Sequence, residues 1–225
     1  METDKSKRRE IKYVVGIEYY NKLHLWIKKN SKGFIKQFKS RLINNIYFDT
    51  INYDLLNENL SGLPDRYKVR LRWYDNINYI DDANLEIKIK KNQVGWKKRK
   101  NFFIKKKTNE LTKQNVKELI ISNINNAELN LLKNLNAVLI NNYKREYYVS
   151  VDGKIRITID KNFKVFNQLK YQYLNDSIRS FYAQNIILEI KYEDKIIKDC
   201  DQLFHNIPFR ASRNSKYVSS FYSLV

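Results

Sequence analysis

The 225-residue sequence is poor in cysteine, glycine and proline, with one, five and two of each. The single cysteine, Cys200, excludes an internal disulfide bond and favours a reducing compartment. Few glycines and prolines leave no stretch typical of a linker, so we predict one domain over residues 1–225. The charged N-terminus lacks a secretory h-region, and no apolar run approaches the roughly 18 residues that span a bilayer. We therefore expect a soluble, cytoplasmic protein.

Residues for nucleophilic or zinc chemistry are also scarce. The two histidines, His24 and His205, lie far apart without ligand-like spacing. Cys200 stands between two aspartates, a setting that disfavours a thiolate. The sequence therefore offers no Cys-His or Ser-His-Asp candidate.

Positive charge is abundant. The formal net charge is +19 and the sequence pI is about 9.7. Such an excess predicts a polyanionic partner, which is nucleic acid, a membrane surface or a phosphate chain. The chain is also 43% hydrophobic and 14% aromatic, enough to form a core.

Eight stretches alternate polar and apolar residues with the period of a β-strand. They cover residues 9–15, 43–49, 66–74, 84–91, 98–105, 143–150, 154–160 and 186–192. An Asp152–Gly153 pair before the seventh is a hairpin signal. Helical patterns cover residues 17–29, 112–142 (two segments), 195–204 and 215–224. The order predicts an α+β protein with an antiparallel sheet, and about eight strands suffice to close a barrel.

The polar faces of these strands repeat positive charge. In RYKVRLRWYD, Lys68, Arg70 and Arg72 share one face, and Val69, Leu71 and Trp73 share the other. In one interpretation the cationic faces meet water, which is the ordinary case. However, like charges opposite each other destabilise a sheet. In the other interpretation the sheet closes with the cations inside, around an anionic ligand. Glu10, Glu86 and Glu189 would then temper the repulsion or hold a divalent metal.

Motifs in order along the chain resemble the VTC domain, the catalytic domain of vacuolar transporter chaperone polyphosphate polymerases, within the triphosphate tunnel metalloenzymes (CYTH-like proteins). They are EIKY, NIYFDT, KVRLRWY, LEIKIK, GWKKRKNF, YKREYY, RITID, LEIKY and SRNSKY. The resemblance implies a closed antiparallel eight-stranded β-barrel with a basic lumen, the triphosphate tunnel, and helices packed outside. It covers almost the whole chain. The first strand keeps only Glu10 and Lys12 of the ExExK pattern, which disfavours a CYTH-type triphosphatase.

The resemblance also implies site residues. Those carried over as catalytic are Arg70, Arg72, Lys88, Arg145, Arg156 and Lys216. Those carried over as substrate-binding are Lys12, Lys90, Lys98, Lys100, Tyr143, Lys191, Arg213 and Ser215. Glu189 resembles the metal-binding glutamate, for Mn²⁺ or Mg²⁺.

Several assignments have alternatives. The lysine-rich run allows Lys97 or Lys98 in place of Lys100. Asp160 is a candidate either for metal binding or for pairing with an arginine. Tyr143 either touches phosphate or packs between helix and sheet. Ser215 is also a candidate cap for the last helix.

The implied function is a metal-dependent polyphosphate polymerase that transfers the γ-phosphate of ATP to a growing polyphosphate chain. A triphosphatase using the same site and a non-catalytic polyphosphate-binding module are the alternatives. A nucleic-acid binder is disfavoured because most aromatic residues alternate onto apolar strand faces. The membrane helices of the eukaryotic polymerases are missing from the sequence. Transport would therefore require a separately encoded membrane protein as partner.

Overall fold

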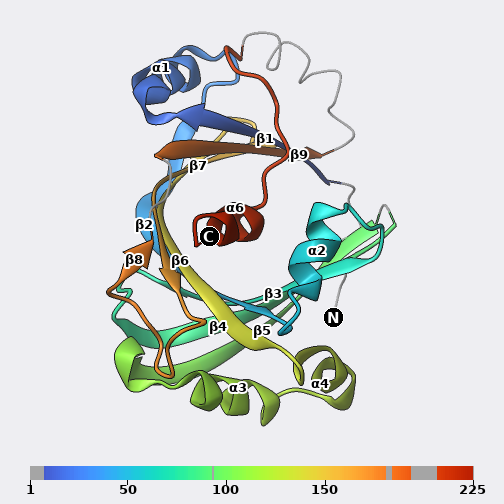
Figure 1. Ribbon diagram of the computed structural model, residues 1–225. Helices are drawn as coiled ribbons and strands as arrows, with labels where there is room; N and C mark the ends of the chain where they lie inside the picture. The colour runs from blue at the N-terminus through green and yellow to red at the C-terminus, as the bar shows by residue number, and fades with distance from the viewer. Residues whose placement is uncertain (1–7, 93, 181–183, 194–206, 225) are drawn as a thin grey trace. The chain divides into compact units, whose positions relative to one another are not determined.

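The computed structural model describes residues 8–92, 94–180, 184–193 and 207–224 (Figure 1). The predicted helix over residues 195–204, with Cys200, and His205 lie outside them. The chain forms two compact units. Unit 1 combines residues 1–41, 143–163 and 183–214, and unit 2 combines residues 42–142, 164–182 and 215–225. Three long strands contribute residues to both units, namely β2 (Ile35–Asp49), β6 (Asn136–Val149) and β7 (Ile155–Asn167).

The described strands form a sheet in the order β1-β9-β7-β6-β2-β3-β4-β5, with the short β8 (Arg179–Ser180) against β7. The remaining strands are β1 (Arg8–Gly16), β3 (Arg66–Tyr74), β4 (Tyr79–Lys91), β5 (Val94–Lys107) and β9 (Asn185–Glu193). The pairings of β1 with β9, β9 with β7, β2 with β3, β3 with β4 and β4 with β5 are antiparallel. The predicted antiparallel α+β class is therefore confirmed. Closure into a barrel stays a prediction, because β1 and β5 end the described strand order.

In unit 1, an apolar core forms between β1, β9, β7 and the helix α1 (Tyr20–Lys29), which follows a 3₁₀ turn at Ile17–Tyr19. Leu23 and Ile27 are the buried residues of α1, one helical turn apart, and they join Ile157 and Leu188 of the sheet in this core. The alternation of β1, β7 and β9 therefore directs one face of each strand to the helix. Glu10 and Lys12 of β1, Arg156 of β7, and Glu189 and Lys191 of β9 lie on the other face.

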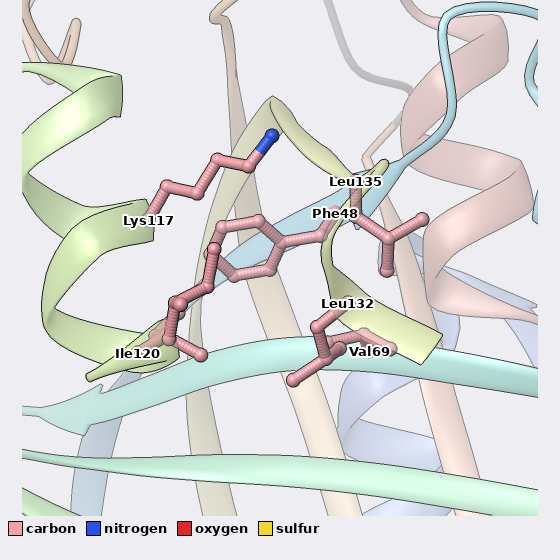
Figure 2. Close-up of a pocket in the computed structure, with 7 residues that line it drawn as sticks. Phe48, Val69, Lys117, Ile120, Leu132 and Leu135 are labelled. Atoms are coloured by element: carbon pink, nitrogen blue, oxygen red, sulfur yellow. The ribbon is translucent and has the colours of Figure 1, made fainter. Parts of the chain in front are cut away.

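In unit 2, α3 (Lys113–Ile121) and α4 (Asn126–Leu132) pack on the apolar face of the sheet, after a 3₁₀ turn at Thr108–Glu110. Val69 and Leu71 of β3 and Leu85 and Ile87 of β4 belong to this core. Figure 2 shows the small apolar cavity at the edge of this layer, where Phe48 and Val69 of the sheet lie near Ile120 and Lys117 of α3. None of the predicted site residues lines this cavity. It lies between helix and sheet and is lined by apolar side chains apart from Lys117.

The opposite face of the same sheet is covered in part by α6 (Lys216–Tyr222), with α2 (Asp54–Leu60) beside it. Tyr217 of α6 packs with Tyr47 of β2, Leu56 of α2 and Leu139 of β6. Tyr47 alternates with Ile46 and Phe48, which face α3 and α4, so α6 lies on the other side of the sheet (Figure 1). The expectation that all helices pack on the apolar face is therefore wrong for α6.

The segment 136–142 corrects a second expectation, because it is the first half of β6 and not part of a helix. Leu139 and Ile140 are both fully buried but belong to different cores, one on each face of the sheet. A strand buried on both faces loses its alternation, and its continuous apolar run is then indistinguishable from helical patterning. In addition, β2 begins at Ile35, well before the predicted residue 43, and α2 was not predicted. None of the helices in the described ranges is long and apolar enough to cross a membrane.

Candidate anion-binding clusters

In unit 2, one buried carboxylate gathers four cationic side chains. Glu86 is 2% exposed, and its Oε2 accepts hydrogen bonds from Arg70 Nε at 2.8 Å and Nη2 at 2.6 Å. Its Oε1 accepts from Lys97 Nζ at 2.5 Å and from Arg99 Nη2 at 3.0 Å. Arg72 Nη1 lies 3.9 Å from Oε2. We call Glu86, Arg70, Arg72, Lys97 and Arg99 the Glu86 cluster.

The strand register explains this arrangement. Residues paired across antiparallel strands share a face, and Arg70, Glu86 and Arg99 form one row across β3, β4 and β5. Lys68, Lys88 and Lys97 form the next row. Over four such rows, the face carries Arg66, Lys68, Arg70, Arg72, Lys88, Lys90, Lys97 and Arg99 as cations, with Glu86 as the one carboxylate. Eight cations against one carboxylate make this face strongly attractive to an anion.

The protonation of Glu86 follows from these neighbours. Burial alone would raise the pKa of its carboxyl group. The charges of Arg70, Arg72 and Lys97 outweigh burial and hold the pKa of Glu86 well below its ordinary value. Burial lowers the pKa of Lys97, and the contact with Glu86 opposes that shift. Glu86 is therefore ionised at neutral pH and neutralises only part of the cluster.

Two predicted binding residues, Lys98 and Lys100, lie on the opposite face of β5. Lys98 pairs in register with Ile87, and Lys100 pairs with Leu85, both of which belong to the core under α3 and α4. Lys98 Nζ lies 3.4 Å from Glu128 of α4. The structure thus does not bring Lys98 and Lys100 to the Glu86 cluster, because side chains alternate along a strand. Lys97, which the sequence left as an alternative, takes that place together with Arg99.

In unit 1, a second cluster crosses β1, β9 and β7. Lys12, Glu189 and Thr158 form one row, and Glu10, Lys191 and Arg156 form the next. Lys191 Nζ lies 2.5 Å from Glu189 Oε1 and 3.7 Å from Glu10 Oε2, and Lys12 Nζ lies 2.7 Å from Glu10 Oε1. Lys12 also donates to the backbone oxygen of Asn214 at 3.2 Å. The structure therefore brings together the predicted residues Lys12, Arg156, Glu189 and Lys191.

Asp160 of β7 anchors Arg145 of β6. Its Nε and Nη2 donate to the two carboxylate oxygens of Asp160 at 2.5 and 2.7 Å, and Asp160 is fully buried. Burial disfavours the charged guanidinium, but the charges of Asp160 and Glu189 raise the pKa of Arg145 well above its ordinary value. Of the two roles open to Asp160, the structure shows the pairing with arginine.

The remaining predicted residues have mixed placements. Tyr143 is fully buried, with its ring 5.0 Å from that of Phe163 and under the Arg145 guanidinium. These contacts come from β6 and β7, and both predicted roles of Tyr143 stay predictions. Ser215 is the N-cap of α6, accepting from Val218 N, and it also accepts from Lys68 Nζ at 2.9 Å. Lys216 is the first residue of α6, and Arg213 is exposed.

In the second cluster, the buried carboxylate open to a resident metal would be that of Glu189. The described residues contain no group of three or more His, Cys, Asp or Glu side chains placed to hold a metal ion. Thr158 of β7 pairs in register with Glu189 of β9. Its hydroxyl is buried and lacks a hydrogen-bond partner among the described residues. Such a donor pair fits Mg²⁺ or Mn²⁺ only when substrate phosphate oxygens supply further ligands, as is usual for these ions.

The sequence pattern did not indicate Arg99, and it gave Glu86 only the general role of tempering repulsion or holding a metal. The alternation of β5 could have shown that Lys97 and Arg99 share a face. It could not show which face, because both faces of that strand are rich in lysine.

A family model described as the VTC domain matches residues 7–225. No curated protein matched the chain. Solved structures of similar fold include a candidate adenylyl cyclase from Hippeastrum in which triphosphatase activity is dominant. It is 15% identical with a TM-score of 0.56, over 95% of this chain and 94% of that one.

Candidate adenylate cyclases from two bacteria have the same fold. The Bacillus halodurans protein is 13% identical with a TM-score of 0.54, over 96% of this chain and 97% of its own. The Vibrio parahaemolyticus protein is 10% identical with a TM-score of 0.50, over 93% and 95%. At these identities the likeness concerns the fold alone.

Proposed function

Because the chain belongs to the VTC domain family, we propose that it is a metal-dependent phosphotransferase that moves the γ-phosphate of ATP to the end of a polyphosphate chain. The observation that carries this proposal is the cationic face of β3, β4 and β5, which carries eight cations and one carboxylate, Glu86, over four rows of paired residues. A sheet tolerates such repulsion between like charges when a polyanion binds to its cationic face. A triphosphate provides closely spaced charges and many acceptor oxygens in an extended line.

The proposed chemistry is positioning and electrostatic stabilisation. Arg70 and Arg72 present planar guanidinium groups that bind two phosphate oxygens each, and Lys88 and Lys97 supply compact charges beside them. These groups neutralise charge on the transferring phosphoryl group and hold the acceptor in line. Arg145, Arg156, Lys12 and Lys191 of unit 1 have the same role in the proposal. No activated side-chain nucleophile is required, because the attacking oxygen belongs to the phosphate chain.

The proposed metal, Mn²⁺ or Mg²⁺, would be held by Glu189 and would neutralise charge on the phosphate oxygens. Glu189 Oε1 contacts Lys191 Nζ at 2.5 Å, so this lysine would shift toward phosphate when a cation binds. The remaining proposed substrate contacts are Arg213, Ser215 and Lys216. Because Ser215 already accepts from Lys68, its contact with substrate would replace or share that hydrogen bond.

Hydrolysis is the second candidate, favoured by the triphosphatase activity of the Hippeastrum protein of the same fold. With water as the acceptor, the same cationic face would release inorganic phosphate. We expect a cytoplasmic protein that does not bind nucleic acid. A separately encoded membrane protein would be its partner if the product is translocated.

The experiment compares two neighbouring lysines of β5 in the purified protein with ATP and Mn²⁺ or Mg²⁺. Products are separated on a gel stained for polyphosphate, and free phosphate is assayed in parallel. Lys97→Ala removes a cation of the Glu86 cluster, and Lys98→Ala removes one from the opposite face. Losing a charge-assisted contact should reduce the rate of Lys97→Ala by about 10- to 100-fold, while Lys98→Ala keeps nearly full activity.

Glu189→Ala serves as the control without the proposed metal ligand. Polyphosphate ladders in the wild type that disappear in Glu189→Ala would support the polymerase. Free phosphate without ladders would establish the triphosphatase instead. If neither product forms and tripolyphosphate still raises the melting temperature, the chain is a binding module and the catalytic proposal is wrong.

A further inference from the structure

The C-terminal helix α6 connects to each of three cations on β3. Ser215 Oγ accepts a hydrogen bond from Lys68 Nζ at 2.9 Å. Arg70 Nη1 donates to Tyr47 OH at 3.4 Å, and the Tyr47 ring stacks on Tyr217 of α6 with centroids 5.0 Å apart. Arg72 reaches the helix through two asparagines. All of these residues belong to unit 2.

The connection to Arg72 is a chain of three buried hydrogen bonds. Arg72 Nε donates to Asn45 Oδ1 at 2.7 Å. Asn45 Nδ2 donates to Asn141 Oδ1 at 2.8 Å, and Asn141 Nδ2 donates to Ser220 Oγ at 3.0 Å. Asn45, Asn141 and Ser220 are each 0% exposed. No part of this chain is therefore open to replacement by bulk water.

The donors and acceptors along this chain of hydrogen bonds can be assigned from the side-chain chemistry. An arginine side chain has only donors, so Asn45 must present its oxygen to Arg72 and its amide group to the next residue. Asn141 must then turn its own oxygen toward Asn45 and its amide toward an acceptor, which is Ser220. Removing that acceptor leaves a buried donor unsatisfied, which costs more than an exposed hydrogen bond does.

We propose that α6 is a positioning element for the cationic face, in which Ser220 orients the Arg72 guanidinium through Asn141 and Asn45. Asn45 and Glu86 lie near different nitrogens of Arg72. The hydrogen-bond chain from Ser220 holds Arg72 at Nε, and Arg72 Nη1 lies 3.9 Å from Glu86. The orientation matters for a triphosphate only if the proposed function holds. The connection itself does not depend on that function.

The first test observes Arg72 without substrate. The Nε–H group of Arg72 gives a ¹H–¹⁵N NMR signal, identified by its loss in Arg72→Lys. In the wild type its proton should exchange slowly with solvent, because it donates within a buried network. Ser220→Ala should accelerate this exchange by about 2- to 10-fold, the equivalent of one neutral hydrogen bond. The matched control is Ser223→Ala, which removes a hydroxyl of the same helix end that bonds only the Ser220 backbone oxygen in the described contacts.

The second test measures tripolyphosphate affinity by calorimetry in a double-mutant cycle. Ser220→Ala should weaken binding by about 2- to 10-fold in the wild-type background and have no further effect in the Arg72→Ala background. A merely structural effect of Ser220→Ala would persist in both backgrounds.

The two tests separate the two proposals. Unchanged exchange of Arg72 Nε–H in Ser220→Ala, or acceleration equal to that in Ser223→Ala, overturns the positioning role. Faster exchange in a protein that does not bind tripolyphosphate supports the positioning role and refutes the proposed function. If Ser220→Ala weakens binding equally in the wild-type and Arg72→Ala backgrounds, the positioning role is also overturned, because the effect would then not depend on Arg72.

Discussion

Removing the charge of Glu86 should be costly because the carboxylate is buried while its cationic partners remain. The substitution Glu86→Gln keeps the size of the side chain and its ability to accept hydrogen bonds. Removing one partner of a buried ion pair typically costs about 3–5 kcal/mol. The side chains of Arg70, Lys97 and Arg99 are 26%, 41% and 54% exposed, so solvent offsets part of the loss. We therefore expect the free energy of unfolding to fall by about 3 kcal/mol, the lower end of that range.

The assay is urea unfolding at neutral pH, with Glu128→Gln as the matched control. Glu128 pairs with Lys98 at 3.4 Å on the helix-covered side of the same unit, where both side chains are more exposed than Glu86. Exposed pairs contribute about 0–1 kcal/mol, so this variant should unfold almost like the wild type. If the two variants lose the same small amount, Glu86 does not organise the cluster and the reasoning is refuted.

The stability difference between wild type and Glu86→Gln should also depend on pH. The folded-state pKa of Glu86 lies below its ordinary value of 4.5, because the nearby arginine and lysine charges outweigh burial. A depressed carboxyl pKa contributes stability that is fully present above the unfolded value and is lost as pH falls toward the folded value. The stability difference between wild type and Glu86→Gln should therefore be constant near neutral pH and shrink in acid below 4.5. A difference that grows on acidification would contradict the sign of this shift.

Two further substitutions test buried polar contacts, one in each unit. Asp160→Asn leaves the Arg145 guanidinium without its bidentate carboxylate partner, so the free energy of unfolding should drop by about 3–5 kcal/mol. Thermal unfolding would show this as a lower melting temperature, and an unchanged value would contradict the buried pairing. Tyr217→Phe removes the hydroxyl that donates to Asp49 Oδ2, a charged acceptor, so it should cost about 1.5–3 kcal/mol in urea unfolding. A loss below about 0.5 kcal/mol would show that the hydrogen bond does not form in solution.

Most strands could be predicted from the sequence because one of their faces is buried and the other is polar. The strand β3 spans the predicted residues Arg66–Tyr74, and the Asp152–Gly153 turn lies between β6 and β7 with Gly153 at a φ of +73°. The first half of β6 was missed for the opposite reason. Val138, Leu139 and Ile140 are all buried, so its pattern lacks the period of two on which the prediction depends.

The candidate site was predicted best where a strand carries cations on one face only. Arg70 and Arg72 alternate with Leu71 and Trp73, and the structure places them together at Glu86. On β5, lysines occupy both faces, so the pattern could not distinguish Lys97 from Lys98. The pairing of Lys98 with Ile87 settles the question, because a shift of one residue moves every side chain to the other face.

The sequence by itself determined the antiparallel α+β class, the cationic faces of the strands and the family resemblance, because these depend on residues close together in the chain. Tertiary structure alone decided which cations meet a carboxylate and which helix holds them. Glu86 of β4 gathers residues from the two neighbouring strands through their register. Ser220 reaches Arg72 through hydrogen bonds whose partners lie 79 and 96 positions apart in the chain. Such contacts depend on how strands pair and on which face α6 covers, and local patterning contains neither.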